Sequence, residues 1–191
     1  MNTKKISLTI VFAALTVALN PAISGVGVPA PYLPFLIYGL WEIPIAVAFL
    51  LIGPKSGAAI MIINAVMLFA FFPGALLMGP FYNLVAIATM LSGVYIAQKI
   101  AKSEVLKQKH LAIVVTTATT IGIVFRVISM SLVNYATLRL ESPFGFGSPE
   151  AYIVGILPLL ALFNGTVVLY TIPIAYTIVK TVQKNTHLNL D

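Results

Sequence analysis

Long apolar runs, which follow one another with only brief interruptions, constrain the fold of this chain most strongly. Between residues 35 and 97 three such runs are separated only by residues 53–57 and 73–80, which are rich in Gly and Pro. A helix needs about 20 residues, with a range of about 17 to 25, to cross the hydrocarbon core of a bilayer. The runs therefore predict neighbouring antiparallel helices that span a membrane.

Charged residues are too rare here for a soluble globular domain. They make up 8% of the 191 residues, and 60% are hydrophobic, whereas a soluble domain is about a quarter charged. We therefore expect an all-α integral membrane protein of the cell membrane, with one domain over residues 1–191 and no soluble part. Six transmembrane helices are predicted at residues 6–24, 35–52, 57–73, 79–98, 111–138 and 150–179.

The basic residues indicate how the helices are oriented. The net charge of +6 does not indicate nucleic-acid binding, because the basic residues do not cluster with aromatic residues. They fall at the ends of apolar runs, and lysines mark the cytoplasmic side of membrane proteins. Both termini are therefore predicted to be cytoplasmic. Of the remaining basic residues, Arg139 would lie on the outer side of the membrane and Arg126 within a span. The cytoplasmic set is Lys4, Lys5, Lys55, Lys99, Lys102, Lys107, Lys109, Lys180 and Lys184.

Apart from Glu150 at the first residue of the last span, Arg126 and Glu42 are the charged residues within the predicted spans. An arginine near the middle of a span costs at least about 2.5–3.5 kcal/mol unless it is paired. At about 1.5 Å per residue, Glu42 lies about 10 Å and Arg126 about 18 Å below the outer surface, so the arginine side chain could reach the carboxylate. One interpretation is a buried ion pair that orients two helices. Another is contact with a polar ligand, and a third is a proton relay.

Asparagines occur on four of the predicted spans, at Asn64, Asn83, Asn134 and Asn164. Single amides can simply bond helices together. Four of them beside tyrosines could instead line a pocket for a flat ligand rich in heteroatoms, because each amide donates and accepts hydrogen bonds. Asn83, Asn134 and Tyr135, near the outer ends of their spans, are the stronger candidates.

Further candidates lie on the predicted outer side of the membrane. Tyr32, Tyr38 and Trp41 belong either to a pocket or to the interfacial aromatic belt. The outer connections at residues 24–34, 73–79 and 139–149 either fold over an outward-facing cavity or are ordinary links between helices.

The sequence offers no residues for catalysis, a metal or a bound cofactor. It contains no cysteine, and its two histidines, His110 and His187, fall in polar segments. No nucleophile–base pair lies within a span, and no P-loop or Rossmann fingerprint is present. We therefore expect no enzyme, and active transport would need another subunit or an ion gradient.

Short motifs are spread over nearly the whole chain: WEIP at residues 41–44, LIGPKSG at 51–57, IN at 63–64, GPFYN at 79–83, SLVNY at 131–135 and LFN at 162–164. This pattern resembles the substrate-binding S component of energy-coupling factor (ECF) vitamin transporters, which are small six-helix proteins with cytoplasmic termini. The NY and FN motifs are most similar to the riboflavin type. That type commonly has a lysine three residues after the FN asparagine, where this chain has Val167.

The resemblance implies capture of a vitamin, riboflavin in the first place, from outside the cell. It also implies partners: a transmembrane coupling subunit and two ATPases, which drive release into the cytoplasm. Ala14 and Ala18 match the family's AxxxA motif for docking on the coupling subunit. The substrate-binding candidates are Glu42, Asn83, Arg126, Asn134, Tyr135 and Asn164.

Two other functions remain open at this point. A carrier that works alone and is coupled to ions would use Arg126 and Glu42 as ion-pairing or titrating groups. A membrane assembly scaffold would bind no small molecule.

Overall fold

The computed structural model describes residues 3–71, 78–101 and 111–185. The predicted cytoplasmic residues Lys102, Lys107 and Lys109, both histidines and most of the predicted connection at 73–79 lie outside these ranges. The helices and strands, in chain order, are α1 (Thr3–Leu19), α2 (Pro21–Ser24), β1 (Val28–Ala30), β2 (Leu33–Tyr38), α3 (Glu42–Leu51), α4 (Pro54–Phe71), α5 (Met78–Ala101), α6 (Leu111–Thr137) and α7 (Glu150–Asn185).

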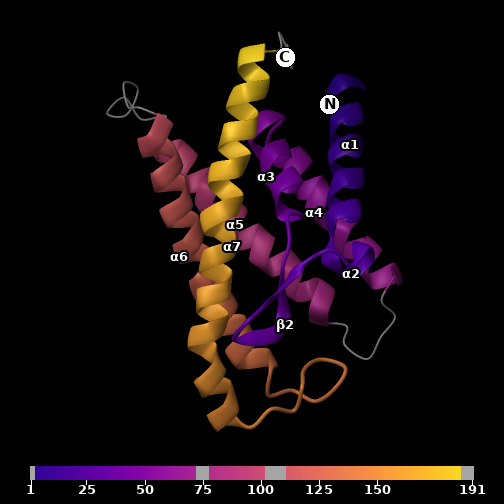
Figure 1. Cartoon of the computed structure of the whole chain (residues 1–191), viewed down its shortest axis with the longest axis vertical. Helices are drawn as coiled ribbons and strands as arrows, with labels where there is room; N and C mark the ends of the chain where they lie inside the picture. The colour runs from indigo at the N-terminus through magenta and orange to yellow at the C-terminus, as the bar shows by residue number, and fades with distance from the viewer. Residues whose placement is uncertain (1–2, 72–77, 102–110, 186–191) are drawn as a thin grey trace.

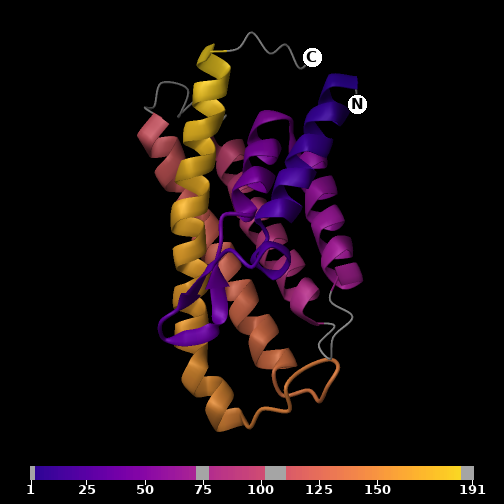
Figure 2. The ribbon, with the colours of Figure 1, turned by 45° about the vertical axis from the view of Figure 1, so that its right-hand side comes forward.

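Five of these helices form a closed ring. α3 packs on α4, α4 on α5, α5 on α6, α6 on α7, and α7 on α3. α1 lies outside the ring against α3 and α4. The start of α1 and the end of α7 lie at the same end of the molecule (Figures 1 and 2).

Among the described residues, four helices, α4 to α7, are long and apolar enough to cross a membrane. α7 has 36 residues and is therefore about 54 Å long, against about 30 Å for the hydrocarbon core. Length and composition make this chain a membrane protein. The predicted span at 6–24 is divided in two: α1 ends at Leu19, and Asn20 caps the short α2 by accepting a hydrogen bond from the Ala22 amide at 3.1 Å.

The predicted second span at residues 35–52 is wrong in its first part, and the fold is not all-α. β1 and β2 form an antiparallel hairpin, and α3 has only 10 residues. Apolar length alone does not separate a helix from a strand. Within residues 35–41 only Gly39 disfavours a helix, because glycine is a poor helix former, and Pro29, Pro31 and Pro34 all lie just before this segment.

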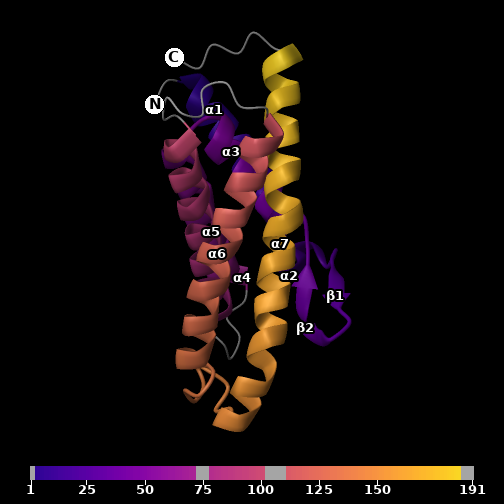
Figure 3. The ribbon, with the colours of Figure 1, turned by 90° about the vertical axis from the view of Figure 1, so that its left-hand side faces the viewer.

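The hairpin stands beside α7 (Figure 3). The rings of Tyr38 and Phe163 lie 4.7 Å apart between centroids. The Tyr170 hydroxyl donates a hydrogen bond to the Gly39 carbonyl oxygen at 2.7 Å. These contacts fix the end of β2 to the middle of α7.

α3 forms the centre of the hydrophobic core. Every residue from Glu42 to Phe49 is buried. The helix ends before Gly53, whose φ of +131° favours glycine, and Pro54 begins α4. Trp41 is also part of this core, at 6% exposure, so the aromatic-belt interpretation is wrong for that residue.

Candidate functional site

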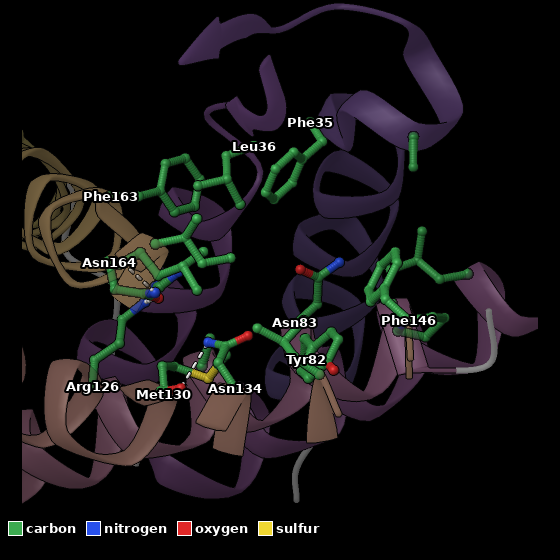
Figure 4. A pocket seen from close by; sticks show the side chains of 18 residues that line it. Phe35, Leu36, Tyr82, Asn83, Arg126, Met130, Asn134, Phe146, Phe163 and Asn164 are labelled. Atoms are coloured by element: carbon green, nitrogen blue, oxygen red, sulfur yellow. Dashed lines mark hydrogen bonds between the residues drawn. The ribbon is translucent and has the colours of Figure 1, made fainter. Parts of the chain in front are cut away.

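A cavity of about 400 Å³ is lined mainly by β2, α5, α6 and α7, with Ala22 of α2 and Leu68 of α4 at its wall. This volume falls within the range of about 300–1,000 Å³ that is usual for small-molecule sites. Its wall is mostly apolar and includes Phe35 and Leu36 of β2 and Phe163 of α7. Polar side chains from three helices enter the same space (Figure 4).

One face of α6 supplies Arg126, Met130 and Asn134 to the cavity. These residues are spaced four apart on the buried stripe of the helix, and residues at that spacing share a face. Tyr135 follows Asn134 and is therefore turned by about 100° around the helix. It lies on the outer face, where its hydroxyl donates to Glu150 Oε1 at 2.8 Å.

Arg126 forms a buried ion pair with Glu42, which confirms the ion-pair interpretation. Arg126 Nη2 donates to Glu42 Oε1 at 2.9 Å, and Nη1 donates to Oε2. The two side chains are 3% and 4% exposed. Glu42 is the first residue of α3, where the positive end of the helix dipole favours a carboxylate. Arg126 lines the cavity, whereas Glu42 lies behind it.

The three amides that line the cavity differ in how far the protein satisfies them. Asn164 Oδ1 accepts a hydrogen bond from Arg126 Nε at 2.9 Å, and its Nδ2 donates to the Leu160 carbonyl at 2.9 Å. Asn134 Nδ2 donates to the Met130 carbonyl at 2.7 Å, which leaves its Oδ1 without a partner among the described residues. The Asn83 amide has no hydrogen-bond partner in the described part of the chain. Asn83 and Asn134 therefore offer donors and acceptors to a guest.

Asn64 does not belong to this site. It is 1% exposed, and its Oδ1 accepts a hydrogen bond from Asn20 Nδ2 at 3.1 Å. This bond links α4 to the end of α1. Of the four asparagines, three therefore line the cavity, and Asn64 has the helix-bonding role.

Aromatic residues that the sequence analysis did not name as site candidates complete the wall. They are Phe35, Tyr82, Phe146 and Phe163. Tyr82 also joins α5 to α6, because its hydroxyl lies 2.7 Å from Thr137 Oγ1. Phe146 comes from the connection at 139–149, so this loop does reach the cavity. Phe35 lies on the strand that was predicted as helix, so helical periodicity could not assign it to the site.

The hydroxyls of Tyr32 and Tyr38 hydrogen-bond each other within the hairpin. Burial raises the pKa of Tyr32 to about 12, and the hydrogen bond with the Tyr38 hydroxyl makes a smaller contribution in the same direction.

Ala14 and Ala18 lie on the exposed face of α1. The opposite face packs on the ring: Thr9, Ala13 and Thr16 are buried. The small side chains therefore leave a flat, apolar helix surface open to a neighbour.

Within the described residues, no group of three or more His, Cys, Asp or Glu side chains could hold a metal ion. Fold and site together define a small helical membrane protein with a ligand-sized cavity near one end. A solved structure with the same fold is the S component of a bacterial ECF transporter. It matches with a TM-score of 0.74 and 19% identity over 96% of this chain and 98% of that chain. No family model matches the sequence, and no curated protein matches it.

Proposed function

We propose that this chain is the substrate-binding S component of an ECF-type transporter. It takes a vitamin-sized molecule from outside the cell into the cavity and delivers it to the cytoplasm. The observation that carries the proposal is the Asn83 amide, which has no hydrogen-bond partner among the described residues and lies beside Asn134 in a cavity of about 400 Å³ (Figure 4). Unpaired polar groups are costly at membrane depth, so a guest that binds them accounts for their presence. The motifs and the shared fold support the same function.

Riboflavin is the guest that we propose first. A flat ring system fits between aromatic walls, where offset or edge contacts with Phe35, Phe146 and Phe163 add to apolar burial. The polar edges of such a ring match the amides. Val167 stands where the riboflavin type commonly has lysine, and it is buried in the core at 3% exposure. Recognition would therefore depend on the amides rather than on a lysine.

The lysines support an orientation with both termini in the cytoplasm. Lys4 and Lys5 lie at the start of α1, and Lys180 and Lys184 lie near the end of α7. These helix ends share one end of the molecule (Figure 1), and the cavity lies toward the other. Lysine-rich ends face the cytoplasm, so the cavity would open outward.

The exposed face of α1 is the proposed docking surface for the coupling subunit. Ala14 and Ala18 are exposed on it, and small residues four apart allow close helix packing. Two ATPases bound to that coupling subunit would supply the energy for release.

The proposal is tested by purifying the protein and identifying any retained small molecule by mass spectrometry. A yellow preparation with flavin absorption would support riboflavin. A preparation that retains nothing and shows no thermal shift with a panel of vitamins would contradict a substrate-binding role. Uptake by the chain alone in proteoliposomes, driven by an ion gradient, would favour a stand-alone carrier instead.

A further inference from the structure

One charged side chain, Arg126, lines the cavity among its described residues. Its charge is matched from behind the wall, because both carboxylate oxygens of Glu42 accept hydrogen bonds from its two terminal nitrogens. Only 3% of the Arg126 side chain is exposed. The cavity is therefore lined by an arginine that contributes almost no net charge.

Arg126 is also held in place from its other side. Its Nε donates to Asn164 Oδ1 at 2.9 Å, and Nη1 lies 3.8 Å from Met90 Sδ. Figure 4 shows the link between Arg126 and Asn164 at the edge of the cavity. With its nitrogens directed at α3, α5 and α7, the guanidinium is not free to turn toward an anionic guest.

This arrangement treats charged and uncharged guests differently. An ion that leaves water for a low-dielectric site needs a matching charge there to repay its lost hydration. The positive charge that could match an anion is that of Arg126, and Glu42 already pairs with it. For a cation, no carboxylate of the described residues lines the cavity. An uncharged guest needs only hydrogen bonds, which Asn83 and Asn134 can supply.

We infer that Glu42 sets the charge selectivity of the cavity. By neutralising Arg126, it restricts the guest to molecules without net charge, although Glu42 itself does not reach the guest. The inference rests on the proposed substrate-binding function and specifies the class of substrate that the cavity accepts.

The first test does not depend on knowing the substrate. Glu42→Ala removes the carboxylate and leaves Arg126 with an unmatched charge beside the cavity, where formate is small enough to replace the lost group. Thermal unfolding is measured in formate and in chloride at equal ionic strength. We expect formate to raise the unfolding temperature of Glu42→Ala by at least about 2 °C.

The wild type and Asn64→Leu, a variant that leaves the contacts of Arg126 unchanged, should show no difference between the two anions. Equal unfolding temperatures of Glu42→Ala in the two anions would overturn the inference, and so would the same shift in all three proteins.

The second test uses Glu42→Gln, which keeps the shape of the side chain and one acceptor oxygen and should fold more readily. Binding of riboflavin and of riboflavin 5′-phosphate is measured for the wild type and for this variant by flavin fluorescence. We expect the preference for the uncharged flavin to fall by at least about tenfold in the variant. An unchanged preference would overturn the inference. If neither flavin binds while formate still rescues Glu42→Ala, riboflavin is the wrong substrate and the charge inference stands.

Discussion

Asn83 and Asn64 are both amides in apolar helices, yet the structure predicts opposite consequences for their replacement by leucine. Asn83 lines the cavity and has no partner among the described residues. Asn64 is 1% exposed, accepts a hydrogen bond from Asn20 and does not line the cavity. Leucine has a similar size in each case and removes only the amide. The pair therefore separates a binding role from a structural role.

Asn83→Leu should weaken binding without lowering stability. It breaks no hydrogen bond within the described structure, so the unfolding temperature of the empty protein should stay the same or rise slightly. A lost hydrogen bond that leaves a buried partner unsatisfied costs about 1–3 kcal/mol. At 1.4 kcal/mol per factor of ten, this corresponds to a loss of affinity of about 5- to 140-fold.

Asn64→Leu should do the reverse. It removes the 3.1 Å bond from Asn20 and leaves a buried donor unsatisfied. Interhelical bonds in bilayers average about 0.6 kcal/mol, whereas a stranded buried donor costs up to about 3 kcal/mol. We therefore expect a loss of about 1–2 kcal/mol, which lowers the unfolding temperature by about 2–8 °C for a chain of this length. Affinity for the guest should change less than about twofold, because the Asn64 side chain does not line the cavity.

The assays are thermal unfolding in detergent micelles without ligand and equilibrium titration with riboflavin, or with whichever molecule co-purifies. If Asn83→Leu lowers the unfolding temperature as much as Asn64→Leu does, Asn83 has a structural role and the contrast between the two amides is refuted. It is refuted equally if Asn83→Leu binds the guest as tightly as the wild type, because its free amide would then have no role in recognition.

Three further predictions concern helix packing and docking. Gly93→Ala should destabilise the protein by about 1–3 kcal/mol, because the added Cβ would lie 2.8 Å from a backbone oxygen of α6. The matched control is Gly155→Ala, whose added Cβ would have nothing within 4 Å, and thermal unfolding compares the two variants. Tyr170→Phe should cost about 1 kcal/mol in the same assay, because the carbonyl after β2 loses its 2.7 Å hydrogen bond. Replacing Ala14 or Ala18 by tryptophan should abolish co-purification with a coupling subunit while riboflavin affinity stays unchanged, and normal complex formation by both variants would contradict the docking proposal.

The sequence predicted the long helices well, and for a physical reason. Apolar length is a direct requirement of the bilayer, so α4 to α7 appear as long apolar runs. The partnership of Glu42 with Arg126 was also predictable, because a deep arginine needs a counter-charge and Glu42 was the one acid away from the end of a predicted span. The hairpin was not predicted, because a short apolar run has the same composition whether it forms a strand or part of a helix.

The site was predictable only where helix periodicity applies. Arg126 and Asn134 share a face because they lie two turns apart, and the same count turns Tyr135 away from them. The assignment of Asn64 depended on which helices become neighbours in space. That information is tertiary, because Asn20 and Asn64 meet only when α1 packs against α4 in the folded protein. Phe35 could not be found without first recognising the strand.

The short length of α3 accounts for the existence of the cavity. If residues 35–41 continued the helix upstream of Glu42, their side chains would follow the helical rise toward the end of the molecule where the cavity opens. Instead the chain leaves the helix, and β2 runs beside α7 and forms one wall through Phe35 and Leu36. The backbone polar groups of this segment then need other partners in an apolar setting, and β1 and Tyr170 supply them. The same break places Glu42 at a helix N-terminus, where its charge is favoured and where it meets Arg126. A single departure from helical structure thus opens the cavity and positions the carboxylate that neutralises its wall.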